Sequence, residues 1–405
     1  MKLHICLIII TLSPVLSLDA QPTAYVLNTT GETMSRVNLA NRIVDNDFIT
    51  IGSDLFSYPN QVIVRGTIAY VVASGTNEIQ VIDLRADTTL GFIDIGVATN
   101  PYWMVFLNDH IAYASALVTN EVVKIDVDAR SVIDHIPVGT GPEGMVIYDR
   151  RLYVAHSGFD LGTFMYGQGE VWVIDTDADT VLTVIDVGVN PQYLATDRSG
   201  HIIVVCTGDY FSKFGILYTL DPSANSVLDS AALGGSPGQI SVGPDNIAYI
   251  AAGGFDPSGR GYVYSLDAGQ MLVLHDANNP IVVDSGCTTA TAYQDGTCFA
   301  AGFADTLRII DSSGTSLAAY GVGDGPVHVA FNYQPGDVNG DWSVDIADVT
   351  YLVAFMFRHG PPPVWPGWRG NINGSGGIDI SDVTYLTSFE FRSGPAPRVG
   401  EDWRD

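Results

Sequence analysis

A repeat of 43 to 49 residues runs through most of this 405-residue chain and restricts the folds open to it. In each copy an apolar run ends in an aspartate, and these aspartates are Asp83, Asp126, Asp175, Asp221, Asp267 and Asp311. This period is typical of a four-stranded β-propeller blade. A proline recurs independently of the aspartates, at Pro59, Pro101, Pro142, Pro191, Pro237, Pro280 and Pro326. Together the two markers predict a mainly β chain with seven blades.

Each copy of the repeat has the pattern of several short β-strands. A β-branched and aromatic run, such as 68–72 or 152–154, is followed by a turn and then by the run that ends in aspartate. Helical spacing of apolar residues does not persist between residues 23 and 331. One such sheet cannot bury both faces by itself, so we expect the sheets to pack around an axis. The recurring aspartates are expected to hydrogen-bond within turns rather than to form catalytic pairs.

The two ends of the repeat array are expected to pair with each other. The array opens at 23–26, which corresponds to the strand after the proline strand, and closes at 326–331, a proline strand with nothing after it. The last segment can therefore complete the first blade. Such pairing removes the exposed sheet edges that an open array would present.

The N-terminus has the pattern of a secretion signal over residues 1–20. Lys2 supplies a positive charge, 3–15 is a short apolar run, and Ala20 is a small residue suited to cleavage before Gln21. The apolar run is too short to span a bilayer comfortably, and no second long one follows. We therefore expect a secreted protein, extracellular or at the cell surface, with no membrane span.

The net charge restricts the classes of partner that the chain can bind, and the cysteine positions restrict which disulfides can form. The chain has 45 acidic and 18 basic side chains, a net charge of −27, which disfavours nucleic acid and anionic lipid surfaces. Cys6 leaves with the signal. Cys287, which follows Gly286, and Cys298 flank a short segment that contains Gly296, so a hairpin disulfide is possible after export, whereas Cys206 lies in an apolar run and is expected to be buried.

The residues after 334 do not follow the repeat pattern and contain two calcium-type loops. The first places oxygen-bearing residues at positions 1, 3, 5, 7, 9 and 12: Asp337, Asn339, Asp341, Ser343, Asp345 and Asp348. The second, 34 residues later, has Asn371, Asn373, Ser375, Gly377, Asp379 and Asp382. A hard cation needs six to eight oxygen ligands, and alternate residues of a tight turn point inward. The alternative of solvated turns fits one isolated loop better than a duplicated pair.

Each loop leads into a predicted helix. Val349, Leu352 and Phe355 recur at helical intervals in the first, and Gly-Pro pairs at 360–361 and 394–395 stop both helices. The loop–helix pair at 336–397 resembles a type I dockerin, a small module that binds two calcium ions and docks on a cohesin domain. The repeats at 23–331 resemble the YVTN β-propellers, through motifs such as 70–73 and 188–191. These resemblances imply a propeller domain at 21–333 and an EF-hand-like dockerin domain at 334–405.

The two loops depart from the dockerin pattern in ways that bear on calcium. Trp342 occupies position 6, where the sharp turn favours glycine. Whether Trp342 distorts the first loop is therefore left open by the sequence. The first loop has four carboxylates and the second has two, Asp379 and Asp382. By charge count the second loop is therefore expected to bind calcium more weakly.

The partner-binding face is inferred from the same resemblance. Dockerins contact cohesin through positions 10 and 11, which are Ile346 and Ala347 in the first loop and Ile380 and Ser381 in the second. The helix-ending Arg358 and Arg392 belong to the same expected face. The familiar polar pairs are missing, which leaves the type of partner open. The proline- and tryptophan-rich insert 361–368 is expected to pack between the helices or to join this face.

The propeller offers only a weak catalytic signal. Residues just after each proline often approach the central funnel of a propeller, and they include Gln61, Trp103, Glu143, Tyr193, Gln239 and His328. They could bind a small polar ligand, with Glu143 and His328 as an acid–base pair, or they could fill space between blades. No P-loop and no HExxH motif is present in the sequence. The expectation is a non-catalytic binding or scaffold protein in a polysaccharide-degrading or cell-surface assembly; the alternative is a lactonase-like or carbohydrate-active propeller hydrolase.

Overall fold

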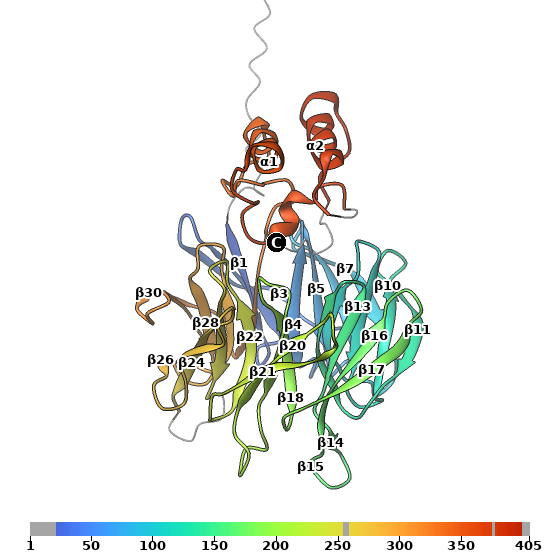
Figure 1. The fold of residues 1–405 in the computed structure, drawn as a ribbon, viewed down its shortest axis with the longest axis vertical. Helices are drawn as coiled ribbons and strands as arrows, with labels where there is room; N and C mark the ends of the chain where they lie inside the picture. Colours follow the sequence, from blue (N-terminus) through green and yellow to red (C-terminus); the bar gives the residue numbers. More distant parts are fainter. Residues whose placement is uncertain (1–21, 254–258, 375–376, 399–405) are drawn as a thin grey trace, which may run out of the picture.

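The computed structural model describes residues 22–253, 259–374 and 377–398. The predicted signal segment at 1–20, Cys6 and the predicted ligand Ser375 lie outside these residues. Within them the chain forms seven β-sheets around one axis and a small helical module at one end of that axis (Figure 1).

Four blades are four-stranded sheets in which each strand pairs with the next along the chain. They are β4 (Pro59–Arg65), β5 (Ile68–Ala73), β6 (Glu78–Asp83) and β7 (Thr88–Asp94); β8 (Pro101–Phe106), β9 (Ile111–Ala116), β10 (Glu121–Asp126) and β11 (Ser131–Pro137); β18 (Pro191–Thr196), β19 (Ile202–Cys206), β20 (Ile216–Asp221) and β21 (Ser226–Ala232); and β27 (Cys287–Ala292), β28 (Cys298–Gly302), β29 (Thr306–Ile310) and β30 (Ser316–Gly321).

The other three blades carry variations. One consists of β12 (Pro142–Tyr148), β13 (Arg151–His156), β16 (Gly169–Asp175) and β17 (Thr180–Val187), with a separate hairpin of β14 (Phe159–Asp160) and β15 (Met165–Tyr166); the next of β22 (Pro237–Val242), β23 (Ile247–Ala252), β24 (Gly261–Asp267), β25 (Leu272–His275) and β26 (Ile281–Val283); the last of β31 (Pro326–Phe331), β1 (Thr23–Asn28), β2 (Thr33–Asn38) and β3 (Ile43–Thr50). The prediction of a mainly β, seven-bladed propeller is confirmed.

The ring closes as the sequence predicts. β31, near the end of the repeat array, pairs antiparallel with β1 at its beginning, with Val329 opposite Val26. Both side chains are buried. The last strand therefore supplies the innermost strand of the first blade.

One proline does not mark the start of an inner strand. The inner strand of the sixth repeat in the chain is β27, which begins at Cys287. Pro280 instead precedes β26, and both β25 and β26 pair with β24. The outer strand of the preceding blade, β22–β26, is thus interrupted after His275 and resumes at Ile281, so Pro280 lies within that blade.

Apolar clusters between neighbouring blades form the core. One cluster joins Val72 and Ile93 of the β4–β7 sheet to Met104 and Val123 of the β8–β11 sheet. Each blade therefore buries one face against the blade before it and the other against the blade after it. This explains why a second strand such as β19 can be buried and apolar at every position.

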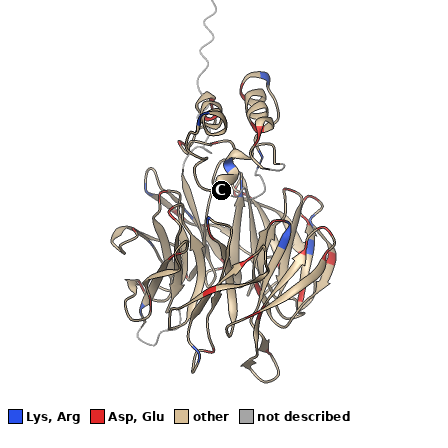
Figure 2. Ribbon diagram, in the orientation of Figure 1, with Lys and Arg blue, Asp and Glu red and all other residues tan. Residues whose placement is uncertain are grey.

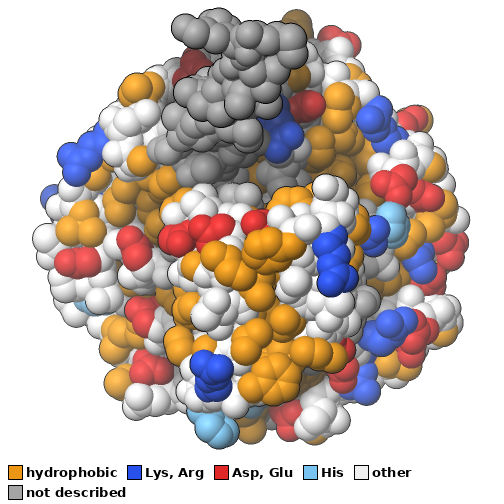
Figure 3. Space-filling model, turned by 90° about the horizontal axis from the view of Figure 1, so that it is seen from above, with side chains coloured by type: hydrophobic (Ala, Val, Ile, Leu, Met, Phe, Trp, Pro, Cys, Tyr) orange, Lys and Arg blue, Asp and Glu red, His pale blue; other side chains and the backbone are white. Residues whose placement is uncertain are grey.

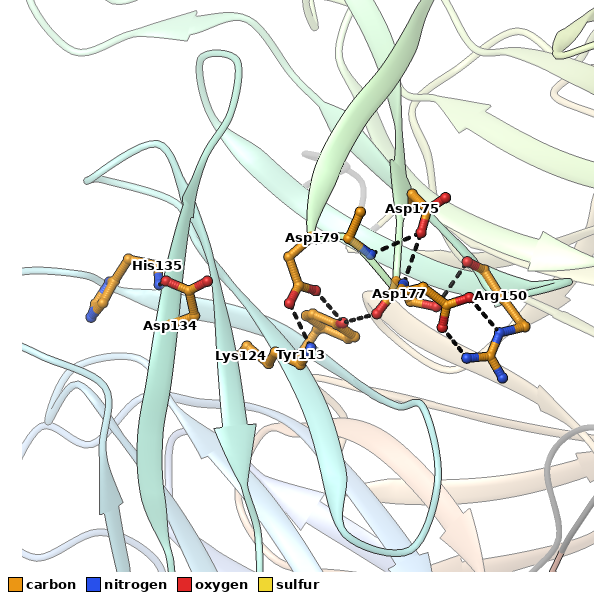
Figure 4. Close-up of polar contacts among 10 residues, drawn as sticks. Tyr113, Lys124, Asp134, His135, Arg150, Asp175, Asp177 and Asp179 are labelled. Carbon is orange, nitrogen blue, oxygen red and sulfur yellow. Dashed lines mark hydrogen bonds and ion pairs between the residues drawn. The ribbon is translucent and has the colours of Figure 1, made fainter.

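The repeating aspartates close turns, as expected. Oδ1 of Asp175 accepts hydrogen bonds from the backbone N–H groups of Asp177 and Ala178, at 2.8 and 3.0 Å (Figure 4). Asp83 and Asp311 make equivalent bonds. These carboxylates are therefore used by the fold.

Polar contacts also link neighbouring blades. The Lys124 ammonium lies 2.6 Å from one oxygen of Asp179 in the next blade, and the Tyr113 hydroxyl donates to the other at 2.7 Å (Figure 4). The few Lys and Arg residues are scattered along the ribbon (Figure 2), and Arg36 and Lys124 each pair with an aspartate of the neighbouring blade.

The disulfide raised as possible by the sequence is not formed. Cys206, Cys287 and Cys298 are free and buried. Cys287 lies opposite Gly302 and Cys298 opposite Ala292, so the two residues occupy opposite ends of the β27–β28 pair. Both pack in the apolar cluster between two blades. The burial expected for Cys206 is confirmed.

The C-terminal module consists of α1 (Ile346–Arg358), the short 3₁₀ helix η2 (Gly367–Gly370) and α2 (Ile380–Arg392). Asp345 caps the N-terminus of α1 and Asp379 caps that of α2. In each cap, the aspartate three residues later accepts a hydrogen bond from the backbone N–H of the capping residue. Leu352 and Leu386 fill the core between the helices. None of the helices among the described residues is long and apolar enough to cross a membrane.

Candidate functional site

The propeller presents two different faces. We call the end at which the inner strands start, where the β14–β15 hairpin projects, the open face (Figure 1). We call the opposite end the capped face, because the C-terminal module covers it (Figure 1). The candidate calcium loops lie at the capped face, and the predicted funnel residues follow the prolines at the open face.

The last residue of each calcium-type loop organises that loop. Oδ1 of Asp348 accepts the N–H groups of Val338 and Asn339 at 2.7 and 3.0 Å, and Oδ2 accepts that of Asp345 at 2.9 Å. Asp382 makes the same three bonds in the second loop. Both carboxylates are fully buried, and burial raises the pKa of each above its usual range. The sequence duplication is therefore a duplication of local structure.

The first residue of each loop is also fully buried. Asp337 opens the first loop and Asn371 the second. Oδ2 of Asp337 accepts the N–H of Trp342 at 3.2 Å, whereas its Oδ1 is buried without a hydrogen-bond partner. Burial raises the pKa of Asp337 to about 6, against the opposing pull of a neighbouring arginine. A buried carboxylate oxygen without a donor is an acceptor that suits a cation.

This arginine is Arg369, which no sequence pattern indicated. Its guanidinium is fully buried and lies 3.3 Å from Oδ2 of Asp337. It also donates to Oε1 of Gln294 in the β27–β28 turn at 2.8 Å and lies 4.7 Å from the ring centre of Tyr333. Arg369 therefore joins the first loop to the propeller. A lone arginine in a proline- and tryptophan-rich insert has no distinguishing pattern in the sequence.

Trp342 keeps the left-handed turn that position 6 requires, with φ of 69°. Its ring packs at the edge of the propeller cluster that includes Tyr293 and Phe331, and the Arg369 guanidinium lies 5.6 Å from the ring centre. Packing against the propeller thus compensates for a backbone conformation that usually needs glycine. The first loop retains its turn.

The residues of the loops fit a calcium ion chemically. All of the predicted side-chain donors are oxygens, and Asp337 contributes a buried oxygen with no other partner. Among the described residues, no three His, Cys, Asp or Glu side chains converge on one point. A calcium-type loop differs from such a cluster because amide, hydroxyl and backbone oxygens supply part of its coordination.

The insert 361–368 returns along the loops instead of separating the helices. The Tyr351 hydroxyl of α1 donates to the carbonyl of Pro362 at 3.1 Å, and the N–H of Val364 donates to that of Val338. The ring of Trp365 meets that of Tyr333 edge to face, with centres 5.5 Å apart. The insert therefore helps to attach the module to the propeller.

The predicted funnel residues divide into two groups. Gln61 and Gln239 tie neighbouring blades together: Gln61 exchanges two hydrogen bonds with the backbone of Met104, and Gln239 accepts from Thr289 and Ala290. The polar groups of both side chains are therefore used in hydrogen bonds between blades.

Trp103, Tyr193 and His328 pack against one another near the axis. The ring centres of Trp103 and Tyr193 are 5.6 Å apart and those of Trp103 and His328 are 5.4 Å apart. Burial lowers the pKa of His328 to about 4, so this imidazole is neutral at pH 7. These rings fill space, as one of the two readings of the sequence expected.

Glu143 lies in a different environment from His328. It is buried beside Ser157 and Gln192, which hydrogen-bond to it, and its Oε2 has no partner. Burial raises the pKa of Glu143 to about 8, so its carboxyl group is protonated at neutral pH. The tyrosines nearest to it include Tyr210, which the sequence did not indicate.

We expect the Glu143→Gln variant to remove a specific loss of stability that the wild type shows as the pH rises from 4.5 to about 8. Because the folded pKa of Glu143 exceeds the ordinary value of 4.5, the folded chain binds more protons between pH 4.5 and 8. Wild-type stability therefore falls as pH rises through this window, by on the order of a few kcal/mol. Glutamine mimics the protonated acid and has no such dependence.

Thermal unfolding of both proteins at pH 5 and pH 9 measures this difference. The two melting temperatures should be similar at pH 5, and the variant should be the more stable at pH 9. A constant gap between the two proteins at all pH values would contradict burial of the protonated acid.

A cavity of about 940 Å³ lies between the module and the capped face. It is lined by the ends of inner strands and by the insert, with Arg65, Phe106, Tyr148, Arg198, Trp365 and Trp368 among its residues. Arg65 pairs with Asp109 at 2.6 Å. The charge of Arg65 is therefore compensated within the protein.

Comparison with solved structures identifies the propeller fold and no family. The structure resembles a Kuenenia stuttgartiensis hydrazine synthase chain (TM-score 0.57, 16% identity, covering 69% of this chain and 90% of that one). It also resembles a functionally unknown protein of Desulfotomaculum acetoxidans (0.58, 12%, 76% and 98%) and a streptogramin B lyase (0.55, 10%, 68% and 88%). No family model and no curated protein matches the chain. Identities this low show a shared fold alone.

Proposed function

We propose that the protein is a secreted, non-catalytic scaffold whose C-terminal module binds calcium in two loops and docks on a cohesin-type domain. The supporting observation is the 34-residue duplication, in which Asp348 and Asp382 make identical sets of hydrogen bonds beneath identically capped helices. A polysaccharide-degrading or cell-surface assembly is the proposed setting.

An exposed apolar surface on the module suits docking. Ile346 and Ile380, at position 10 of the two loops, are 54% and 57% exposed, and Phe357 and Phe391, in the last turns of the helices, are 59% and 60% exposed. We call these four residues the helix patch. Apolar side chains gather on the face of the molecule that carries the helices (Figure 3). Such side chains are costly to leave in water and are typical of a binding surface.

Docking is tested with the full chain and a recombinant type I cohesin domain. We expect binding in calcium, none in chelator, and a loss of about 100-fold in affinity for Ile346→Asp/Ile380→Asp, because a charge in an apolar contact must be desolvated. Calorimetry measures the affinity. The matched control is Ile133→Asp, an exposed isoleucine on the outer strand β11.

Two results would count against docking through the helix patch. One is equal affinity of the double variant and the wild type for the cohesin domain. The other is binding that is unchanged by chelation of calcium.

The second candidate function is a propeller hydrolase carried by the same module. The observation that favours it is the protonated, buried Glu143, which could act as a general acid. Glu143 contacts Ser157 and Gln192, whereas His328 packs against Trp103, so these contacts give no support to an acid–base pair of the two. Loss of a lactone- or glycoside-hydrolysing activity in Glu143→Gln would favour the hydrolase.

A further inference from the structure

The open face carries a strip of aromatic rings that nothing in the docking function uses. The rings of Phe164, Phe159, Tyr166 and Tyr210 follow one another with centres 6.2, 5.1 and 6.2 Å apart. Phe211 follows Tyr210 directly in the chain. Phe164 is 73% exposed and Phe211 is 89% exposed. We call these five residues the aromatic strip.

The strip is held in place by two structured turns. Oδ1 of Asp209 accepts the N–H groups of Phe211, Ser212 and Lys213 at 2.9, 2.7 and 2.7 Å. Oδ1 of Asp160 accepts those of Gly162 and Thr163, both at 2.8 Å, within the β14–β15 hairpin. The backbone that carries the exposed rings is thus ordered before any ligand arrives. A fixed surface loses little conformational entropy on binding.

A buried polar cluster lies beneath the strip. The Tyr210 hydroxyl hydrogen-bonds to Asn190 and Gln192, and Gln192 hydrogen-bonds to Glu143. Asn190 and Glu143 are buried, and Oδ1 of Asn190 and Oε2 of Glu143 have no partner. Polar atoms buried in this way favour a ligand or solvent that brings hydroxyl groups to them.

The two features together define the chemistry of a ligand. Flat apolar surface is needed against the rings, and hydroxyl groups are needed at the polar cluster and at the acidic turns. The carboxylates of Asp160 and Asp209 and the net charge of −27 repel polyanions. Sugar rings combine an apolar face with hydroxyl groups and, when neutral, meet no repulsion. We propose that the open face binds a neutral polysaccharide chain through the aromatic strip.

Affinity electrophoresis of the full chain tests this proposal. The gels contain hydroxyethyl cellulose, xylan, galactomannan or, as an acidic comparator, polygalacturonate. All gels contain chelator, so that a failure of calcium-dependent docking does not affect the result. We expect retardation by at least one neutral polymer and none by polygalacturonate.

Substitution of the strip should weaken this retardation. Phe164→Ala and Phe211→Ala should each lower the affinity about tenfold, because each removes one apolar ring from the contact. The matched control is Phe92→Ala, on the outer strand β7, which should leave the affinity unchanged. Because all three rings are exposed, the variants should melt at nearly the wild-type temperature, which circular dichroism checks.

Three results would overturn the proposal. The first is migration unaffected by every neutral polymer, and the second is equal retardation of the strip variants and the wild type. The third is self-association in sedimentation experiments that Phe211→Ala abolishes, because it would assign the strip to contact between copies of the chain.

Discussion

Arg369→Met is expected to make the folding of the C-terminal module dependent on calcium. The substitution leaves the fully buried carboxylate of Asp337 without its ion-pair partner. Breaking a buried ion pair on one side costs about 3–5 kcal/mol. In chelator, the helices α1 and α2 should therefore lose protection from hydrogen exchange. Calcium should restore it, because a cation held by Asp337 neutralises the same charge.

Hydrogen exchange followed by mass spectrometry, in chelator and in calcium, measures this effect separately for the module and for the propeller. Arg358→Met is the matched control, because Arg358 is exposed at the end of α1. Arg369→Met/Asp337→Asn should regain most of the protection in chelator, since no buried charge remains. Equal exchange of Arg369→Met and the wild type in chelator would show that the ion pair does not stabilise the module.

Val329→Asp is expected to open the propeller. Val329 is buried in β31 and pairs with Val26 across the junction that closes the ring. An aspartate there is an unpaired buried charge, which costs several kcal/mol, and the opened ring exposes two sheet edges. We expect a fall of about 5 °C or more in melting temperature, with aggregation of the opened chain.

Calorimetry and light scattering during heating measure the two consequences. The control is Val282→Asp, because Val282 is 58% exposed on β26, away from the junction. A variant at position 329 that melts with the wild type would mean that the other six blades hold the ring without this junction.

The Arg369 contacts bear on the relative strength of the two loops. Charge count alone gives the first loop four carboxylates and the second loop two. The structure places one guanidinium against Asp337, which offsets part of that negative charge. The calcium affinity of the first loop therefore depends on where Arg369 lies, and the ranking drawn from charge count stays a prediction.

The sequence was sufficient for the features that repeat. Blade number, ring closure and the turn-closing role of Asp175 and its counterparts depend on local patterns, and the structure bears each of them out. The prediction that Pro280 marks the start of a blade was wrong, because no sequence pattern distinguishes the interruption between β25 and β26 from a blade start. The disulfide considered between Cys287 and Cys298 is not formed, because the short segment between them does not bring its two ends together.

Strand periodicity, turn residues and a 34-residue duplication are all patterns of neighbouring residues, so the arrangement of strands and helices could be predicted from them. Which side chains meet across the fold depends instead on how distant segments pack. Arg369 hydrogen-bonds to Gln294, 75 positions away in the chain. Tyr210 belongs to one blade and Glu143 to another, yet the charge of Glu143 acts on the Tyr210 hydroxyl. Burial and contact between distant segments set the charge state of such groups, and neither can be read from the local order of residues.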